Sequence, residues 1–191
     1  MKEHIREALT GRAAAVLDGP ALVPSAVIVP VFSKGSADHL LFTRRTDHVA
    51  RHKGQISFPG GVRERGDPDL LATALREMQE EIGVSPADVE VLGPLDQVST
   101  RQGFAISPFV ATIPFPYDFR PDPHEVAELL EVPLEFFLDH RYVREERDAD
   151  GRTTYYYDYN SHVIWGATAS IVRQLVHLVF PRSSEVSAWT P

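Results

Sequence analysis

The chain has 191 residues, of which 43% are hydrophobic and 24% charged, and this size and composition fit one globular domain with a sizeable core. Its net charge of -8 argues against a nucleic-acid partner, because proteins that bind the phosphate backbone usually carry a basic face. The absence of cysteine excludes disulfides, thiolate nucleophiles and zinc-thiolate centres, which leaves oxygen ligands and hard cations as the expected metal chemistry. We expect a single domain over residues 1–191.

No targeting or membrane segment is predicted. The N-terminal stretch MKEHIREALTGRAAAVLDGP is too charged for the apolar core of a signal peptide. No apolar run approaches the length of a bilayer span, and the final WTP is no targeting tripeptide. We expect a cytoplasmic protein without a membrane partner.

The first half of the chain alternates between the two periods of apolar residues. The pattern predicts a helix over residues 2–17 and a buried strand over residues 27–32. Further strands are expected at LLFTRR, residues 40–45, and at QISF, residues 55–58. A second helix is expected over residues 69–82.

This second helix has marked boundaries and two distinct faces. Asp67 is expected as the N-cap with Pro68 at the first helical position, and Gly83 is expected to end the helix. At about 100° per residue, four apolar side chains share one face and three glutamates fill the opposing arc. The apolar face holds Leu71, Leu75, Met78 and Ile82, and the acidic face holds Glu77, Glu80 and Glu81.

The second half of the chain predicts strands, a hairpin and a terminal helix. Strands are expected at residues 89–95 and 104–113, and EVAELLEV then runs into PLEFFLDH, whose Pro133 suits a first helical turn. Asp150-Gly151 lies between two β-rich runs and predicts a hairpin. The last helix is expected over residues 166–180, and Trp165 is expected in the core. This mixture favours an α+β sandwich over a doubly wound sheet.

The crowded glutamates allow two interpretations. A solvated acidic face is the ordinary one, although each i, i+3 or i, i+4 pair of like charges costs roughly 0.2 to 0.5 kcal/mol on an exposed helix. A divalent-ion site is the other, since a turn at Gly60 and Gly61 would bring backbone groups close to the carboxylates. The joint occurrence of FPGG and REMQEEIGV favours the metal site.

This stretch resembles the signature of the Nudix hydrolase family, which runs Gly, five residues, Glu, seven residues, then Arg-Glu-apolar-any-Glu-Glu-any-Gly-apolar. The second half matches throughout, from Arg76 to Val84. The first half departs, because Asp67 stands in place of glutamate and eight residues rather than seven separate it from Arg76. The resemblance leaves any role of Asp67 beyond capping open.

The resemblance implies the family's α/β/α sandwich with a mixed β-sheet, and hydrolysis of a nucleoside diphosphate linked to another moiety with Mg²⁺ or Mn²⁺. It implies Glu80 and Glu81 as the principal metal ligands and Glu77 as a further ligand or the base that activates water. Arg76 would orient the glutamates, and Gly61 would supply a backbone ligand. A pyrophosphate bridge suits such a site, because metal ions neutralise its charge during in-line attack by water.

The segment LLFTRRTDHVARHKGQISFPGG, residues 40–61, resembles the extended upstream signature of the coenzyme A pyrophosphatase branch of this family. The residues in step with that signature are Thr43, Arg45, Thr46, Gly54 and Phe58. The slot of its second arginine holds Ala50, so Arg51, one place later, either serves instead or is a solvated side chain. Arg45, Arg51 and Gly60 are the expected substrate-binding residues. STRQGFAISPFV and IWGATA resemble further segments of this branch.

Glu125 lies where Nudix proteins often carry a further acidic residue, and it is a candidate base or ligand unless it simply marks a polar strand edge. Two function classes remain open. One is a pyrophosphatase acting on coenzyme A and its thioesters, or alternatively on ADP-ribose or another nucleoside diphosphate derivative. The other is a Nudix-fold module that senses a nucleotide without cleaving it. The intact glutamates favour the enzyme, and a homodimer is compatible with either.

Overall fold

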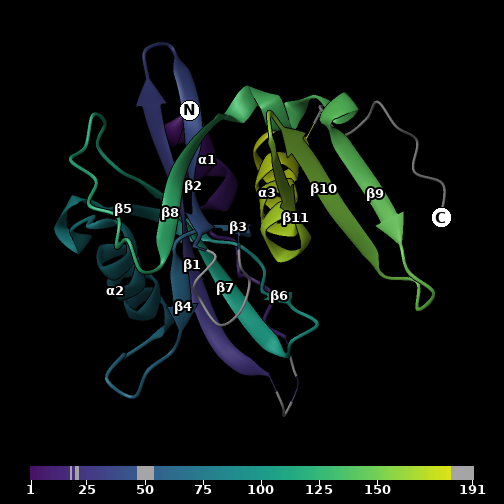
Figure 1. Cartoon of the computed structure of the whole chain (residues 1–191), viewed down its shortest axis with the longest axis horizontal. Helices are drawn as coiled ribbons and strands as arrows, with labels where there is room; N and C mark the ends of the chain where they lie inside the picture. The colour runs from purple at the N-terminus through teal and green to yellow at the C-terminus, as the bar shows by residue number, and fades with distance from the viewer. Residues whose placement is uncertain (18, 20–21, 47–53, 182–191) are drawn as a thin grey trace.

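The computed structural model describes residues 1–17, 19, 22–46 and 54–181. A mixed β-sheet lies between helices on both of its faces (Figure 1). Helix α2 (Leu70–Ile82) packs on one face, and α1 (Lys2–Leu9) and α3 (Gly166–Val179) pack on the other. The α+β sandwich predicted from the sequence is confirmed.

The central sheet is built around one parallel strand pair. Strands β1 and β7 are parallel, and the other pairings, which include β1 with β2, β2 with β8 and β5 with β7, are antiparallel. The short strands β3 and β4 pair with β2 and β1, and β6 pairs with β7. The strand bounds are β1 Val23–Lys34, β2 Ala37–Arg45, β3 Ile56–Ser57, β4 Gly60–Val62, β5 Glu90–Pro94, β6 Val98–Ser99, β7 Phe104–Thr112 and β8 Val126–Pro133.

A second, three-stranded sheet lies beside α3 (Figure 1). It consists of β9 (Val143–Arg147), β10 (Thr153–Tyr159) and β11 (His162–Trp165), in the order β11-β10-β9. The hairpin predicted around Asp150-Gly151 joins β9 to β10, and Gly151 has a φ of 80°, which favours glycine. Short 3₁₀ helices are η1 (Pro86–Asp88), η2 (Leu134–Leu138) and η3 (His140–Tyr142).

Strand β1 shows why the core has two halves. Successive side chains of a strand point to opposite faces, and β1 is buried on both. Ile28 and Phe32 pack in the cluster under α2, whereas Val29 and Val31 pack in the cluster under α1 and α3. An almost continuous apolar run therefore serves two layers at once.

The first helix is shorter than the expected 2–17. It ends at Leu9, and Gly11 adopts a left-handed φ of 72°, which breaks the helical path. The chain beyond it runs along the segment between β5 and β6, where the Ala15 amide donates to the Asp96 carboxylate at 2.6 Å. These external partners replace the hydrogen bonds that a longer helix would have made.

Three other expectations need correction. The N-cap of α2 is Asp69, whose side chain accepts from the Ala72 amide at 2.8 Å, and not Asp67. Pro133 ends β8 instead of lying inside a helical turn, and the 3₁₀ helix η2 follows it. Trp165 is 41% exposed and not part of the core. Within the described residues, no helix is both long and apolar enough to cross a bilayer.

Gly83 ends α2 as expected, in a left-handed conformation with a φ of 73°. A Cβ added there would lie 2.9 Å from the Cβ of Arg120. We expect Gly83→Ala to lower the free energy of unfolding by about 1–2 kcal/mol, because the alanine Cβ makes the left-handed backbone conformation unfavourable. Urea denaturation measures this loss, and Gly66→Ala, which meets open space, is the matched control. Equal stability of the two variants would contradict the prediction.

Candidate active site

Helix α2 presents its three glutamates in three different environments. Glu81 is only 4% exposed, Glu77 is 18% exposed at its side chain, and Glu80 is 59% exposed. Each residue turns the helix by about 100°, so Glu81 points toward the sheet, Glu80 points toward solvent and Glu77 lies between them. The acidic face of the helix is therefore partly buried against the sheet and not simply solvated.

The Gly60-Gly61 pair in β4 allows the helix to approach the sheet. A Cβ on Gly61 would lie 2.4 Å from the carboxyl carbon of Glu77. A Cβ on Gly60, whose φ is 153°, would lie 2.2 Å from the carbonyl oxygen of Ala26. Real Cβ atoms do not approach other atoms so closely, so a side chain at position 60 would clash with the backbone of β1, and one at position 61 would displace the Glu77 carboxylate. The Glu77 carboxylate thus lies directly over the Gly61 backbone.

Arg76 connects the glutamates to the loop before the helix. Its Nη1 contacts Glu77 at 3.0 Å and Glu80 at 2.8 Å. Its Nε and Nη2 donate to the two carboxylate oxygens of Asp67, both at 3.1 Å. Such a two-point contact holds a guanidinium in one orientation, so Asp67 fixes the arginine that contacts Glu77 and Glu80.

Asp67 has a role that the capping interpretation missed. It accepts from Arg76, from the Glu64 amide at 2.9 Å and from the Thr73 hydroxyl at 2.9 Å. The Arg76 hydrogen bond, followed by the Glu64 amide, lowers the pKa of Asp67 far below its usual range. The extra residue between Asp67 and Arg76 is accommodated, because a separate aspartate, Asp69, caps the helix.

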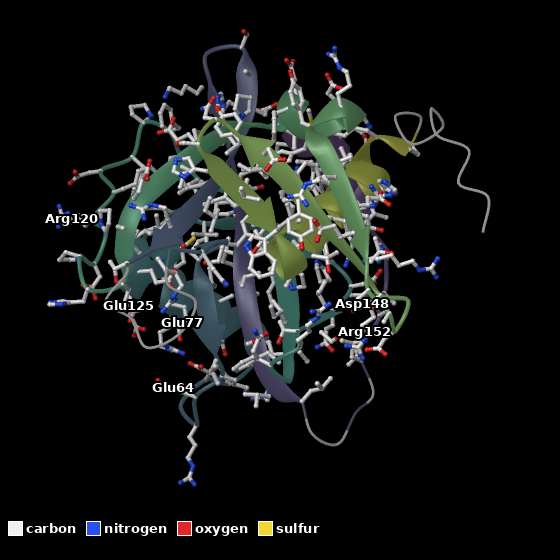
Figure 2. The ribbon with its side chains drawn as sticks, turned by 45° about the vertical axis from the view of Figure 1, so that its right-hand side comes forward. Glu64, Glu77, Arg120, Glu125, Asp148 and Arg152 are labelled. Atoms are coloured by element: carbon white, nitrogen blue, oxygen red, sulfur yellow. The ribbon has the colours of Figure 1, made fainter. Side chains whose placement is uncertain are left out.

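Arg45, at the end of β2, lies between two carboxylates. Its Nη1 is 3.7 Å from Glu81, and its Nη2 is 3.6 Å from Glu125 in the loop before β8. Arg45 Nε and Glu81 Oε2 are buried without a hydrogen-bond partner among the described residues. Figure 2 shows Glu77 and Glu125 on the same side of the molecule, although 47 positions separate them in the chain. Arg45 brings helix and loop to one site.

Backbone hydrogen bonds hold the loop that carries Glu125. The end of α2 accepts two of them: the Arg120 amide donates to the Ile82 carbonyl and the Asp122 amide to the Glu81 carbonyl, both at 2.9 Å. Thr46, next to Arg45, donates its amide to the Glu125 carbonyl at 2.9 Å. Its hydroxyl donates to the His124 carbonyl at 2.8 Å. Thr46 therefore fastens the Glu125 loop to β2.

Burial dominates the electrostatics of the glutamates. Removal from water raises the pKa of Glu81 to about 8, and the Arg45 charge offsets only part of this effect. Removal from water also raises the pKa of Glu77, against the Arg76 charge and hydrogen bond. A divalent cation would therefore stabilise the ionised forms of Glu77 and Glu81 more than the single charge of an arginine does.

The donor set fits a hard divalent cation. Carboxylate and backbone oxygens are what Mg²⁺ and Mn²⁺ prefer, and the buried, unpartnered Glu81 Oε2 is a ready acceptor beside Gly60 and Gly61. Among the described residues, no three carboxylates already converge to hold an ion. Arg45 lies between Glu81 and Glu125, so its guanidinium must shift for both to face one ion.

The structure brings together most of the residues expected from the sequence. Glu77, Glu81, Gly60, Gly61, Arg76, Arg45 and Glu125 lie around this site. Glu80 is held outward by Arg76, and Arg51 lies outside the described residues. The roles of Asp67 and Thr46 were missed, although both residues stand at motif positions that could have indicated them.

Comparisons with known proteins concern the family and the fold of the chain. A family model described as NUDIX domain matches residues 22–152. Relatives named Nudix hydrolase NudL are 37% identical over 158 residues in Photorhabdus laumondii and 39% over 154 residues in Pectobacterium atrosepticum. These alignments cover 81% and 79% of this chain, and 84% and 80% of the relatives.

Solved structures show the same fold. A Deinococcus radiodurans protein matches with a TM-score of 0.56 at 17% identity, over 82% of this chain and 87% of its own. A MutT/nudix family protein from Enterococcus faecalis matches with a TM-score of 0.54 at 13% identity, over 85% of this chain and 64% of its own. At such low identity, the likeness concerns the fold alone.

The raised pKa of Glu81 makes the stability of the metal-free protein depend on pH. Between pH 4.5 and about 8 the folded protein keeps a proton on Glu81 that the unfolded chain has released. The free energy of unfolding must therefore fall as the pH rises through this window. We expect the melting temperature in chelator to fall over the same range and Glu81→Gln to flatten the slope. Glu135→Gln, at an exposed position, is the control, and an unchanged slope in Glu81→Gln would refute the explanation.

Thr46→Val tests how the Glu125 loop is held. Valine keeps the size and the backbone amide bond but removes the hydroxyl that donates to the His124 carbonyl. We expect a loss of about 1 kcal/mol of stability and faster hydrogen exchange at the amides of Glu125 and Val126. Thr10→Val removes a similar bond at an exposed site and is the control. Unchanged exchange at these amides would show that the loop does not depend on Thr46.

Proposed function

The chain belongs to the Nudix family, and from this premise we propose that it hydrolyses the diphosphate bond of coenzyme A and of its thioesters. The products are 3′,5′-ADP and 4′-phosphopantetheine or its acyl form. Nudix hydrolases generally use divalent metal ions and act on small nucleotide substrates, and the ion proposed here is Mg²⁺ or Mn²⁺.

The position of Arg45 carries the substrate proposal. Arg45 belongs to the segment 40–61 that resembles the coenzyme A branch, and its guanidinium lies against Glu81 and Glu125. An arginine at this position can bind diphosphate oxygens once an ion has taken over the carboxylates. The IWGATA segment supports the same proposal, because the Thr168 hydroxyl donates to the Ile56 carbonyl at 3.2 Å. Two segments that resemble the branch therefore meet beside the site.

We assign the site residues as follows. Glu77, Glu80 and Glu81 hold the ion together with the Gly61 backbone, and Arg76 keeps the glutamates oriented through Asp67. This assignment requires Glu80 to turn inward from its contact with Arg76. When bound, the ion would neutralise charge at the diphosphate and make the attacking water more acidic. Gly60 is assigned to substrate binding through its backbone groups.

Glu125 is the assigned general base. It approaches from a loop outside α2, and its side chain is 47% exposed, so water can reach it. A carboxylate within reach of the attacking water can accept its proton as the oxygen attacks phosphorus in line. Arg45 Nη2 lies 3.6 Å from the same carboxylate, where the diphosphate charge also has to be met.

A substrate panel tests the proposal. With Mg²⁺, we expect coenzyme A to give 3′,5′-ADP and 4′-phosphopantetheine, identified by mass. Dephospho-coenzyme A lacks only the 3′-phosphate, and a lost charge-assisted contact should make it about tenfold to a hundredfold slower. Glu81→Gln should reduce turnover by at least about a hundredfold, while Glu135→Gln should leave it unchanged.

Other outcomes of this panel have defined meanings. Faster cleavage of ADP-ribose than of coenzyme A would move the assignment to ADP-ribose. Equal rates for coenzyme A and dephospho-coenzyme A would reject recognition of the 3′-phosphate. Nucleotide binding without hydrolysis of any diphosphate would indicate a sensing module.

A further inference from the structure

A pocket lies apart from Glu77, Glu80 and Glu81, where β3 and β11 contact each other. Its volume is about 520 Å³. The residues that matter for its chemistry are Arg44, Gln55, Ile56, Glu128, His162 and Trp165. None of the catalytic assignments above uses this pocket, which we call the Trp165 pocket.

Trp165 is unusual because it is large, apolar and 41% exposed. It alternates with the fully buried Ile164, so β11 turns Ile164 to the core and Trp165 outward. Its cross-strand neighbour Tyr156 stacks with it at 6.1 Å between ring centroids and 10° between planes. The Arg144 guanidinium lies 4.2 Å from the Tyr156 ring. A stack backed in this way holds the indole in place while leaving it open to the pocket.

Arg44 gives the same pocket a positive group. Its Nε donates to the Glu128 carboxylate at 3.0 Å, and the other Glu128 oxygen is 3.6 Å from His162. No partner is recorded for the two terminal amino groups of Arg44 among the described residues. They can therefore donate to an anion, which a guanidinium binds well.

The glutamate site and the Trp165 pocket are both built on strand β2. Arg44 and Arg45 are neighbours in β2, about 3.8 Å apart along the backbone, and the pairing with β8 shifts register between them. Their contacts lie on opposite sides of the strand, because Arg45 contacts Glu81 of α2, whereas Arg44 contacts Glu128, which lies 3.6 Å from His162 of β11. The Arg45 amide donates to the Gln55 carbonyl at 2.9 Å, and Gln55 also lines the Trp165 pocket. Gln55 therefore links the strand that carries Arg45 to the Trp165 pocket.

We propose that the Trp165 pocket binds the nucleoside end of the substrate, with the base stacked on Trp165 and a phosphate group on the ribose bound by Arg44. Nucleobases stack on aromatic side chains, and Arg44 provides the charge that such a phosphate requires. The pantetheine end has no aromatic ring and no charged group beyond the diphosphate, so neither feature would serve it. This proposal rests on the proposed function, since it places one half of that substrate.

Calorimetry with 3′,5′-ADP in the absence of metal tests the proposal without hydrolysis. We expect Trp165→Ala to raise the Kd about tenfold and Trp165→Phe, which keeps a stacking ring, to raise it less. Arg44→Ala should weaken 3′,5′-ADP more than 5′-AMP, because only the first carries the additional phosphate. Arg120→Ala, at an exposed arginine, is the control and should change neither Kd.

Fluorescence provides a measurement on the unmutated pocket. Trp165 and Trp189 are the two tryptophans of the chain, so a Trp189→Phe protein reports on Trp165 alone. We expect 3′,5′-ADP to quench this signal and 4′-phosphopantetheine to leave it unchanged. Quenching by 4′-phosphopantetheine in place of 3′,5′-ADP, or an unchanged Kd in Trp165→Ala, would overturn the proposal.

These measurements separate the two proposals. If ADP-ribose is the better substrate, the coenzyme A assignment fails, whereas 5′-AMP binding at Trp165 still measures base stacking directly. If coenzyme A is hydrolysed but Trp165→Ala binds 3′,5′-ADP normally, only the placement of the base fails.

Discussion

The buried carboxylate of Glu81 is the constraint on which the rest of the site depends. Removing a carboxylate from water costs several kcal/mol unless a cation and hydrogen-bond donors compensate for it. Here the compensation comes from Arg45 in β2 and is shared with Glu125, which belongs to a loop much later in the chain. The Arg45 contacts are long, and one Glu81 oxygen has no hydrogen-bond partner among the described residues. The arrangement therefore favours a cation of higher charge beside Glu81.

The scaffold makes this burial possible through close backbone approach. Gly61 lets the Glu77 carboxylate lie against β4, and Gly60 lets β4 lie against β1. The last carbonyls of α2 then accept amides from the loop that carries Glu125. The hydrogen bonds that close the helix therefore also hold the assigned base, so helix and loop form one unit.

Two neighbouring arginines of β2 contact different carboxylates. Arg45 contacts Glu81 and Glu125, whereas Arg44 contacts Glu128 in the Trp165 pocket, and His162 lies 3.6 Å from the same Glu128. Cleavage and recognition of the nucleoside can thus be served by adjacent residues without competing for space. In Figure 2, the side of the molecule with Glu77 and Glu125 is well separated from the hairpin tip marked by Asp148 and Arg152. The second sheet contributes Trp165 of β11, backed by Tyr156 of β10 and Arg144 of β9.

The sequence by itself determined what local physics controls. The apolar period of α2, the stop at Gly83 and the hairpin at Asp150-Gly151 need only neighbouring residues, and they appear in the structure. The motif spacing also identified Glu77 and Glu81, because two residues four apart share a helix face whatever surrounds them. Gly11, however, was not enough to predict that the first helix ends at Leu9. The backbone amides beyond it bond to Asp96 and Gln97, which are distant in the sequence, instead of to helical carbonyls.

Tertiary structure alone decided the electrostatics of the glutamates and the formation of the Trp165 pocket. Asp67 became the partner of Arg76, and Glu80 turned to solvent, because the approach of β4 to α2 sets which carboxylates are covered. Arg45 met Glu125 only through strand pairing between β2 and β8. Trp165 was exposed because the second sheet buries one side of β11, and no local pattern specifies which side a distant helix will cover.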